Sequence, residues 1–391
     1  MARYQEAATV LREALDDMVR RGDADGQVLA AARLTEVLVK CRGTAEGEEL
    51  LRTYPPGPHT PPLTTATHHL AAAVLRFVTG RYESAHAAAR TAQDAADAIP
   101  GSERRGLLAR SLGMQATSLS LAGRLAQARP AAHEALPHAE AYGDHGLLVT
   151  ILSVLREHAS RSGRLAEAIA FGERALRLAE HTGDPTAVAF ERSNLSEHHL
   201  LLREFTESRE HAEAAVRETD GDPTPYALAA LARVLIRTGE PGAAELLARA
   251  GEVADAQGDR QAVHDVRTVQ AEFLVRGDRP QEALALPTEG SSPRSAALLA
   301  WAELLSGQPE RAVRRASAET VRAEQDGERL SLTEARTVHA AALATPGRAR
   351  EADEEFDRAA ELAAELPYPP GAFTVEQARK TDWTTRSGIP G

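Results

Sequence analysis

A glycine followed five residues later by an alanine recurs along the chain, with two looser copies and intervening Gly-Asp pairs. A period with two turns is typical of stacked helix pairs, in which each unit buries its apolar face against the next. This pattern excludes most mixed folds, because it leaves no room for a sheet. The copies are Gly80–Ala85, Gly123–Ala128, Gly163–Ala168, Gly239–Ala244, Gly307–Ala312 and Gly347–Ala352, and the looser ones are Arg203–Ser208 and Gly277–Ala283.

The stretches between these turns predict helices. Ala, Leu, Glu and Arg dominate them, and their apolar residues recur at steps of three and four. Glycine at a turn suits the left-handed end of one helix, and the aspartate after it can cap the next. The alanine falls one turn into the second helix of each pair, where a small side chain allows close packing. We therefore predict an all-α fold of about nine antiparallel helix pairs.

Further small residues lie seven positions after the repeated alanines, at Ala92, Ala135, Ala175 and Ala359. With the Gly and Ala positions, this pattern resembles the tetratricopeptide repeat (TPR) family over residues 2–366. The resemblance implies a right-handed α-solenoid. Most periods exceed the family's usual length of about 34 residues, and its aromatic positions are mostly aliphatic. Longer, Ala-rich repeats of this kind resemble the helical arms of bacterial signalling ATPases and of maltose-activator-like transcription regulators.

The repeats predict four segments. Residues 1–53 form partial TPR-like repeats, 54–62 a Pro-rich interruption, 63–366 the main superhelix and 367–391 an irregular tail. The first residues read as the second helix of a pair whose first helix is absent. We expect that the chain was cut from a longer protein or that it pairs this helix with another subunit.

Composition narrows the class of partner. The net charge of -12 argues against nucleic acid, whose binding depends on clustered positive charge. The single cysteine, Cys41, forms no intramolecular disulfide and excludes a cysteine-rich zinc site. No apolar run approaches the roughly 18 residues of a membrane span. We expect a cytoplasmic bacterial protein with no cofactor, no membrane contact and no direct nucleic-acid contact.

The sequence contains no catalytic arrangement of residues, so we expect that the protein is not an enzyme. Lys380-Thr381 lacks the glycine-rich loop of a nucleotide-binding site. His133 and His138 are five residues apart rather than four, so they diverge around a helix instead of sharing a metal. Asp353–Asp357 gathers carboxylates, for which a solvated face is the favoured interpretation.

The remaining candidate is the concave groove that the TPR resemblance places along the first helix of each pair. Two rare aromatics, a cluster of arginines and the chain's one asparagine fall on or beside it, and guanidinium groups bind carboxylates in bidentate fashion. The candidate binding residues are Phe190, Asn194, Glu197, Tyr226, Arg233, Arg237, His264, Arg267, Arg294 and Trp301; Arg110, Thr117, Ser153, Glu157 and Ser193 are further groove positions.

Residues 190–301 are therefore predicted to recognise an acidic peptide, a protein tail or a small polar ligand. The equally weighted alternative is that these arginines pair with neighbouring carboxylates and only shape the surface. The leading function is a non-enzymatic recognition module, the sensor or partner-binding arm of a bacterial regulator. A free-standing scaffold or adaptor that assembles other proteins is the second hypothesis, and a helical enzyme is a disfavoured third.

Overall fold

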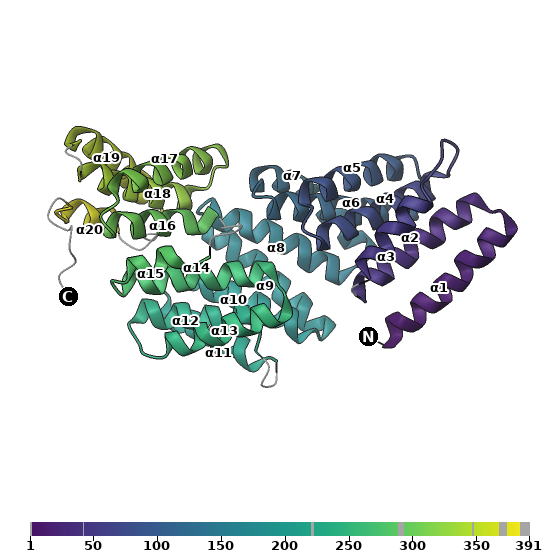
Figure 1. Ribbon diagram of the computed structural model, residues 1–391, viewed down its shortest axis with the longest axis horizontal. Helices are drawn as coiled ribbons and strands as arrows, with labels where there is room; N and C mark the ends of the chain where they lie inside the picture. The colour runs from purple at the N-terminus through teal and green to yellow at the C-terminus, as the bar shows by residue number, and fades with distance from the viewer. Residues whose placement is uncertain are drawn as a thin grey trace. The chain divides into compact units, whose positions relative to one another are not determined.

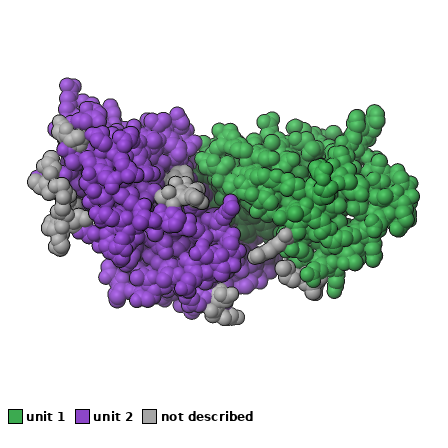
Figure 2. Space-filling model, in the orientation of Figure 1, with its two compact units in different colours: residues 1–155 green, residues 156–391 purple. Residues whose placement is uncertain are grey.

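The computed structural model describes the backbone of residues 2–41, 43–219, 223–287, 293–345, 348–366 and 374–383 (Figure 1). Within these ranges every regular element is an α-helix, which confirms the predicted all-α class. The chain divides into two compact units, residues 1–155 and 156–391 (Figure 2).

Unit 1 contains paired helices of similar length. Packing runs between α4 and α5, between α5 and α6, and between α6 and α7, while α2 packs on both α1 and α4. The short α3 lies between α2 and α4 in sequence. The helices are α1 (Ala2–Arg21), α2 (Ala24–Lys40), α3 (Thr44–Thr53), α4 (Pro62–Val78), α5 (Tyr82–Asp97), α6 (Ser102–Leu121), α7 (Leu125–Tyr142) and α8 (His145–Arg161), whose end belongs to unit 2.

In unit 2 the even-numbered helices form a continuous row, because α10 packs on α12, α12 on α14, α14 on α16 and α16 on α18. This row corresponds to the first helices of the predicted pairs. The helices are α9 (Leu165–Thr182), α10 (Pro185–Leu201), α11 (Phe205–Arg217), α12 (Pro225–Thr238), α13 (Ala243–Gln257), α14 (Arg260–Arg276), α15 (Pro280–Ala285), α16 (Pro293–Leu305), α17 (Pro309–Gln325), α18 (Arg329–Ala344), α19 (Ala349–Ala364) and α20 (Val375–Lys380).

The turns between helices have the predicted conformation. Gly123 and Gly163 are left-handed, with φ of 78° and 81°. Arg203, at the copy that lost its glycine, keeps the same conformation at φ 62°, which side chains rarely adopt. Asp184 and Asp259 each accept two backbone N–H groups at the start of the next helix, as predicted. The turn geometry is therefore conserved between copies even where its usual residue is not.

The repeated alanines lie at helix contacts with one exception. Ala85, Ala128, Ala168 and Ala312 have no exposed surface. Ala244 is exposed, and its neighbour Ala243 is buried instead. The prediction for Ala244 was wrong, because the turn extends to Gly242 and α13 starts at Ala243, so the buried position moves by one residue.

An Ala168→Leu variant is expected to lower the free energy of unfolding of unit 2 by about 1–3 kcal/mol, because the larger side chain overpacks a filled contact. Ala244→Leu is the matched control, since it makes the same change at an exposed position of the same motif. Denaturant unfolding followed by tryptophan fluorescence measures both. Equal destabilisation by the two variants would contradict a role for Ala168 in close packing.

The segment predicted as a Pro-rich interruption lies between α3 and α4. No helix covers residues 54–61, but α2 packs on α4 across them, and the boundary between units falls within α8. The predicted irregular tail contains α20, and Ala378 and Trp383 join the core formed with α16 and α18. In the described part of the chain, no helix is long and apolar enough to cross a membrane.

Candidate functional site

Three neighbouring helices of unit 2 bring five charged side chains together. Glu197 comes from α10, Arg233 and Arg237 from α12, and Glu272 and Arg276 from α14. We call these residues the arginine–glutamate network. The two residues from α12 and the two from α14 are each four positions apart, which places each pair on one helix face.

Glu272 is the centre of the arginine–glutamate network. Its carboxylate lies 2.5 Å from Arg237 Nε, 3.3 Å from Arg233 Nε and 3.3 Å from Arg276 Nε, and its side chain is only 4% exposed. Burial raises its pKa, but the charges of Arg237, Arg233 and Arg276 outweigh burial and hold the pKa below its usual value. Glu272 is therefore ionised at neutral pH and fixes the positions of three guanidinium groups.

Glu197 occupies the outer part of this network. One carboxylate oxygen lies 3.1 Å from Arg233 Nη1, and both side chains keep partial exposure. Arg233 therefore links a buried carboxylate on one side to a more exposed one on the other. A guanidinium group presents five N–H donors in a plane and binds carboxylates through two of them at once, so this position suits an acidic group.

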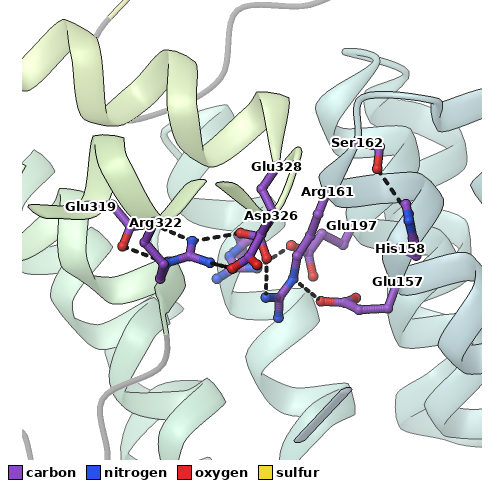
Figure 3. Close-up of polar contacts among 10 residues, drawn as sticks. Glu157, His158, Arg161, Ser162, Glu197, Glu319, Arg322, Asp326 and Glu328 are labelled. Carbon is purple, nitrogen blue, oxygen red and sulfur yellow. Dashed lines mark hydrogen bonds and ion pairs between the residues drawn. The ribbon is translucent and has the colours of Figure 1, made fainter. Parts of the chain in front are cut away.

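A second group of charges surrounds the turn between α17 and α18, and we call it the turn network (Figure 3). Arg322 bonds Glu319, Asp326 and Glu328, while Arg161 bonds Glu157 at 2.7 Å and Glu328 at 3.0 Å. Figure 3 shows Glu197 pointing toward the same region as Arg161.

Burial affects the two buried carboxylates of the turn network differently. For Glu328 burial raises the pKa, but hydrogen bonds from Arg322 and the charge of Arg161 outweigh it, and the pKa lies below its usual value. For Glu319 burial outweighs its bond to Arg322, and the pKa is raised. Glu328 carries the firmer negative charge, because two arginines share it.

The predicted groove residue Tyr226, on α12, contacts Phe190, on α10. Their rings meet at right angles with centroids 5.1 Å apart, and Tyr226 donates its O–H to Asp259 Oδ2 at 3.1 Å. The Phe190 ring has a second contact, because the Arg156 guanidinium lies over it at 5.7 Å from the ring centroid. Both aromatic residues are half-buried.

The other predicted groove residues have varied surroundings. Asn194 Nδ2 donates to the carbonyl of Phe190 within its own helix, at 2.8 Å. Arg267 Nη1 reaches the carbonyl oxygen of Pro287 at 3.5 Å, and burial lowers the pKa of His264. Of the further positions, Arg110 pairs with Glu36, while Thr117 and Ser193 bond carbonyls of their own helices.

Trp301 is the clearest departure from the predicted groove. The residue has no exposed surface, lies in the core of unit 2 and packs on Trp383 with ring centroids 5.5 Å apart. Its assignment to the groove was wrong, because α16 is enclosed and the tail supplies a second indole that covers this position. Arg294, also predicted, lies outside the residues whose side chains are described.

Sequence reasoning missed Glu272, Arg276, Arg161 and Glu328. The spacing of four between Glu272 and Arg276 marks one helix face, but nothing in it indicates that this face meets α12. Arg161 and Glu328 are 167 positions apart, so no local pattern joins them.

The acidic segment Asp353–Asp357 is held by arginines. Glu355 bonds Arg336 and Arg358; burial raises its pKa, but bonds from His339, Arg336 and Arg358 outweigh burial and lower the pKa to about 2. Asp357 pairs with Arg379 of α20. Across the described ranges, no group of three His, Cys, Asp or Glu side chains is placed to hold a metal ion.

Comparisons with known proteins concern the fold. No family model and no curated protein matches the sequence. A solved Rap protein complexed with competence and sporulation factor is 15% identical over 91% of this chain and 99% of that chain, with a TM-score of 0.54. The apo quorum sensor NprR from B. thuringiensis is 12% identical over 92% and 98%, with a TM-score of 0.49. Aspartyl phosphate phosphatase F from Bacillus subtilis is 12% identical over 99% and 91%, also at 0.49.

Proposed function

We propose that this protein is a non-enzymatic, TPR-type recognition module that binds an acidic peptide or a carboxylate-bearing protein segment on the even-numbered helices of unit 2. The arginine–glutamate network supports this proposal most directly. Two helices, α12 and α14, deliver three arginines to one place, and the buried Glu272 holds them in position before any ligand arrives. Such preorganisation reduces the ordering cost of binding.

The pairing of the arginines decides how a ligand would bind. Arg233 and Arg237 are bound to carboxylates of the protein itself, which is the alternative that the sequence left open. An acidic ligand must therefore exchange with one of these carboxylates. Glu197 is the one we assign to exchange, because its side chain is 24% exposed whereas that of Glu272 is 4% exposed.

The similarity in fold to a Rap protein solved with competence and sporulation factor adds support for a ligand-binding role. We further propose that the chain serves as the sensor or partner-binding arm of a bacterial regulator, as the Ala-rich repeats of signalling ATPases and maltose-activator-like regulators suggest. The repeat architecture suits this role, because small rotations between neighbouring pairs add up along the row.

Opposite effects of two substitutions test this assignment. A pool of short synthetic peptides with a single Asp or Glu is screened by fluorescence polarisation, and the best binder is measured by calorimetry. Arg233→Ala is expected to weaken its binding by about 10-fold or more, the usual loss for a charged hydrogen bond. Glu197→Gln is expected to tighten it by about 2- to 5-fold, because a competing carboxylate is removed.

Arg177→Ala is the control, since this side chain is 66% exposed and far less constrained. Tryptophan fluorescence verifies that each variant is folded. Unchanged affinity in Arg233→Ala, or weaker binding in Glu197→Gln, would contradict the proposal.

The second candidate is a free-standing scaffold. The ion pairs of Arg233 with Glu197 and Glu272 favour it, since a paired arginine can also serve only to shape a surface. Thermal shift separates the two functions. Stabilisation by a peptide from the pool indicates recognition, whereas stabilisation by a protein partner alone indicates a scaffold.

A further inference from the structure

One contact in unit 2 departs from the usual rule of stacked repeats, in which each pair touches only its neighbours. Arg161, at the end of α8, bonds Glu328, at the start of α18. Arg161 precedes α10, the first helix of the row in unit 2, and Glu328 lies at α18, the last helix of that row. The contact therefore joins the end of the helix that precedes the row to the last helix of the row.

An apolar contact accompanies this ion pair. Gly163 forms the turn between α8 and α9, and a Cβ atom placed on it would lie 2.6 Å from Leu366 Cδ2 and 3.9 Å from Arg329 Cβ. Leu366 follows α19 and is buried, and Arg329 begins α18. Gly163 thus serves two purposes, since it allows the left-handed turn and leaves space for the far end of the row.

The charges on both sides hold the ion pair in place. Arg161 is bound by Glu157 of its own helix, and Glu328 is bound by Arg322 of α17 (Figure 3). Both partners are largely buried, with side chains 14% and 2% exposed, so solvent screens their attraction weakly. Each charge is therefore positioned before the two ends meet.

We propose that Arg161, Glu328 and Leu366 form a latch that holds unit 2 closed on itself, and that breaking the Arg161–Glu328 bond opens it. The ion pair joins two side chains, and only the side chain of Leu366 approaches the backbone at Gly163. The latch therefore opens without disturbing any helix. Opening separates the α8–α9 turn from the α17–α18 turn.

The latch also bears on ligand entry, a consequence that rests on the proposed function. Glu197 points toward the same region as Arg161, so the latch lies beside the exchangeable end of the arginine–glutamate network (Figure 3). A closed latch restricts the approach to Glu197 and Arg233, and an open one admits a peptide.

Distance measurement by pulsed dipolar EPR tests the latch in the ligand-free protein. Spin labels are attached at Glu167→Cys in α9 and Glu324→Cys in α17, whose side chains are 40% and 63% exposed. The native Cys41 is replaced by Ser. Arg161→Met removes the charge but keeps an apolar stem, and Leu366→Ala weakens the same latch from its other side. Arg177→Ala is the control on α9.

Both latch variants are expected to add a population at longer distance, and hydrogen exchange at residues 163–167 and 328–332 is expected to become about tenfold faster. Arg161→Lys retains the charge and should restore most of the wild-type distribution. Wild-type distances in both folded latch variants would overturn the proposal. No ligand enters this experiment, so its failure leaves the peptide-binding proposal intact, and unchanged peptide affinity in Arg233→Ala leaves the latch intact.

Discussion

An Arg156→Ala variant is expected to lose about 3–5 kcal/mol of the free energy of unfolding of unit 2, because the substitution leaves a buried carboxylate without its partner. Arg156 is 3% exposed and pairs with Glu191, which has no exposed surface. The same guanidinium lies over the Phe190 ring, so the substitution also removes this contact. The substitution destabilises the native state, because water hydrates both charges in the unfolded chain.

Denaturant unfolding measures this effect specifically in unit 2. Both tryptophans of the chain, Trp301 and Trp383, belong to unit 2, so their fluorescence follows its unfolding. Arg177→Ala, at an exposed ion pair of α9, is the control and should cost no more than about 1 kcal/mol.

A double variant separates the cost of an unpaired charge from that of lost packing. Arg156→Met with Glu191→Leu removes both charges at similar volume and is expected to recover more than half of the loss. If Arg156→Ala were as mild as the control, or if the double variant were worse than the single one, the buried pair would not be the cause.

Periodicity alone predicted the helices and their turns, because both depend on local interactions. The turn at Arg203 is an example, because this copy has lost its glycine and Arg203 still has the left-handed backbone. Ala244 shows the limit. A turn one residue longer shifts the buried position to Ala243, and turn length depends on local backbone geometry rather than on the repeat.

The candidate site could be predicted only in part. The TPR resemblance placed Arg233 and Arg237 in one groove, and the structure brings both to Glu272. Their partner Glu272 could not be identified, because an ion pair between helices depends on how α12 and α14 are aligned. The contact of Arg161 with Glu328 is harder still, since it depends on rotations summed over every pair in the row.

The second large expected effect concerns substitution of Trp301. The TPR resemblance placed it on the groove, where it counted as one of the rare aromatics. The core near α16 differs, because α20 and Trp383 pack against it from the tail. Trp383 is itself fixed, since its indole N–H donates to the carbonyl of Ala378 at 2.7 Å.

Trp301→Ala is therefore expected to lower the free energy of unfolding of unit 2 by about 3–5 kcal/mol, the usual cost of removing a buried tryptophan. Removal of the indole leaves a cavity against Trp383 and exposes no new ligand contact. The remaining Trp383 reports the transition by fluorescence, and its emission should shift to longer wavelength already in the folded variant.

Phe205→Ala is the control for removal of an aromatic side chain, because Phe205 is 41% exposed in the same unit and its loss should change stability by about 0.5 kcal/mol or less. The peptide found by the pool screen adds a second measurement. A groove residue would lose affinity and keep stability on substitution, whereas a core residue loses stability and keeps the affinity of the folded fraction. If Trp301→Ala kept normal stability and lost peptide affinity, Trp301 would be a residue of the binding face, and its placement in the core would be contradicted.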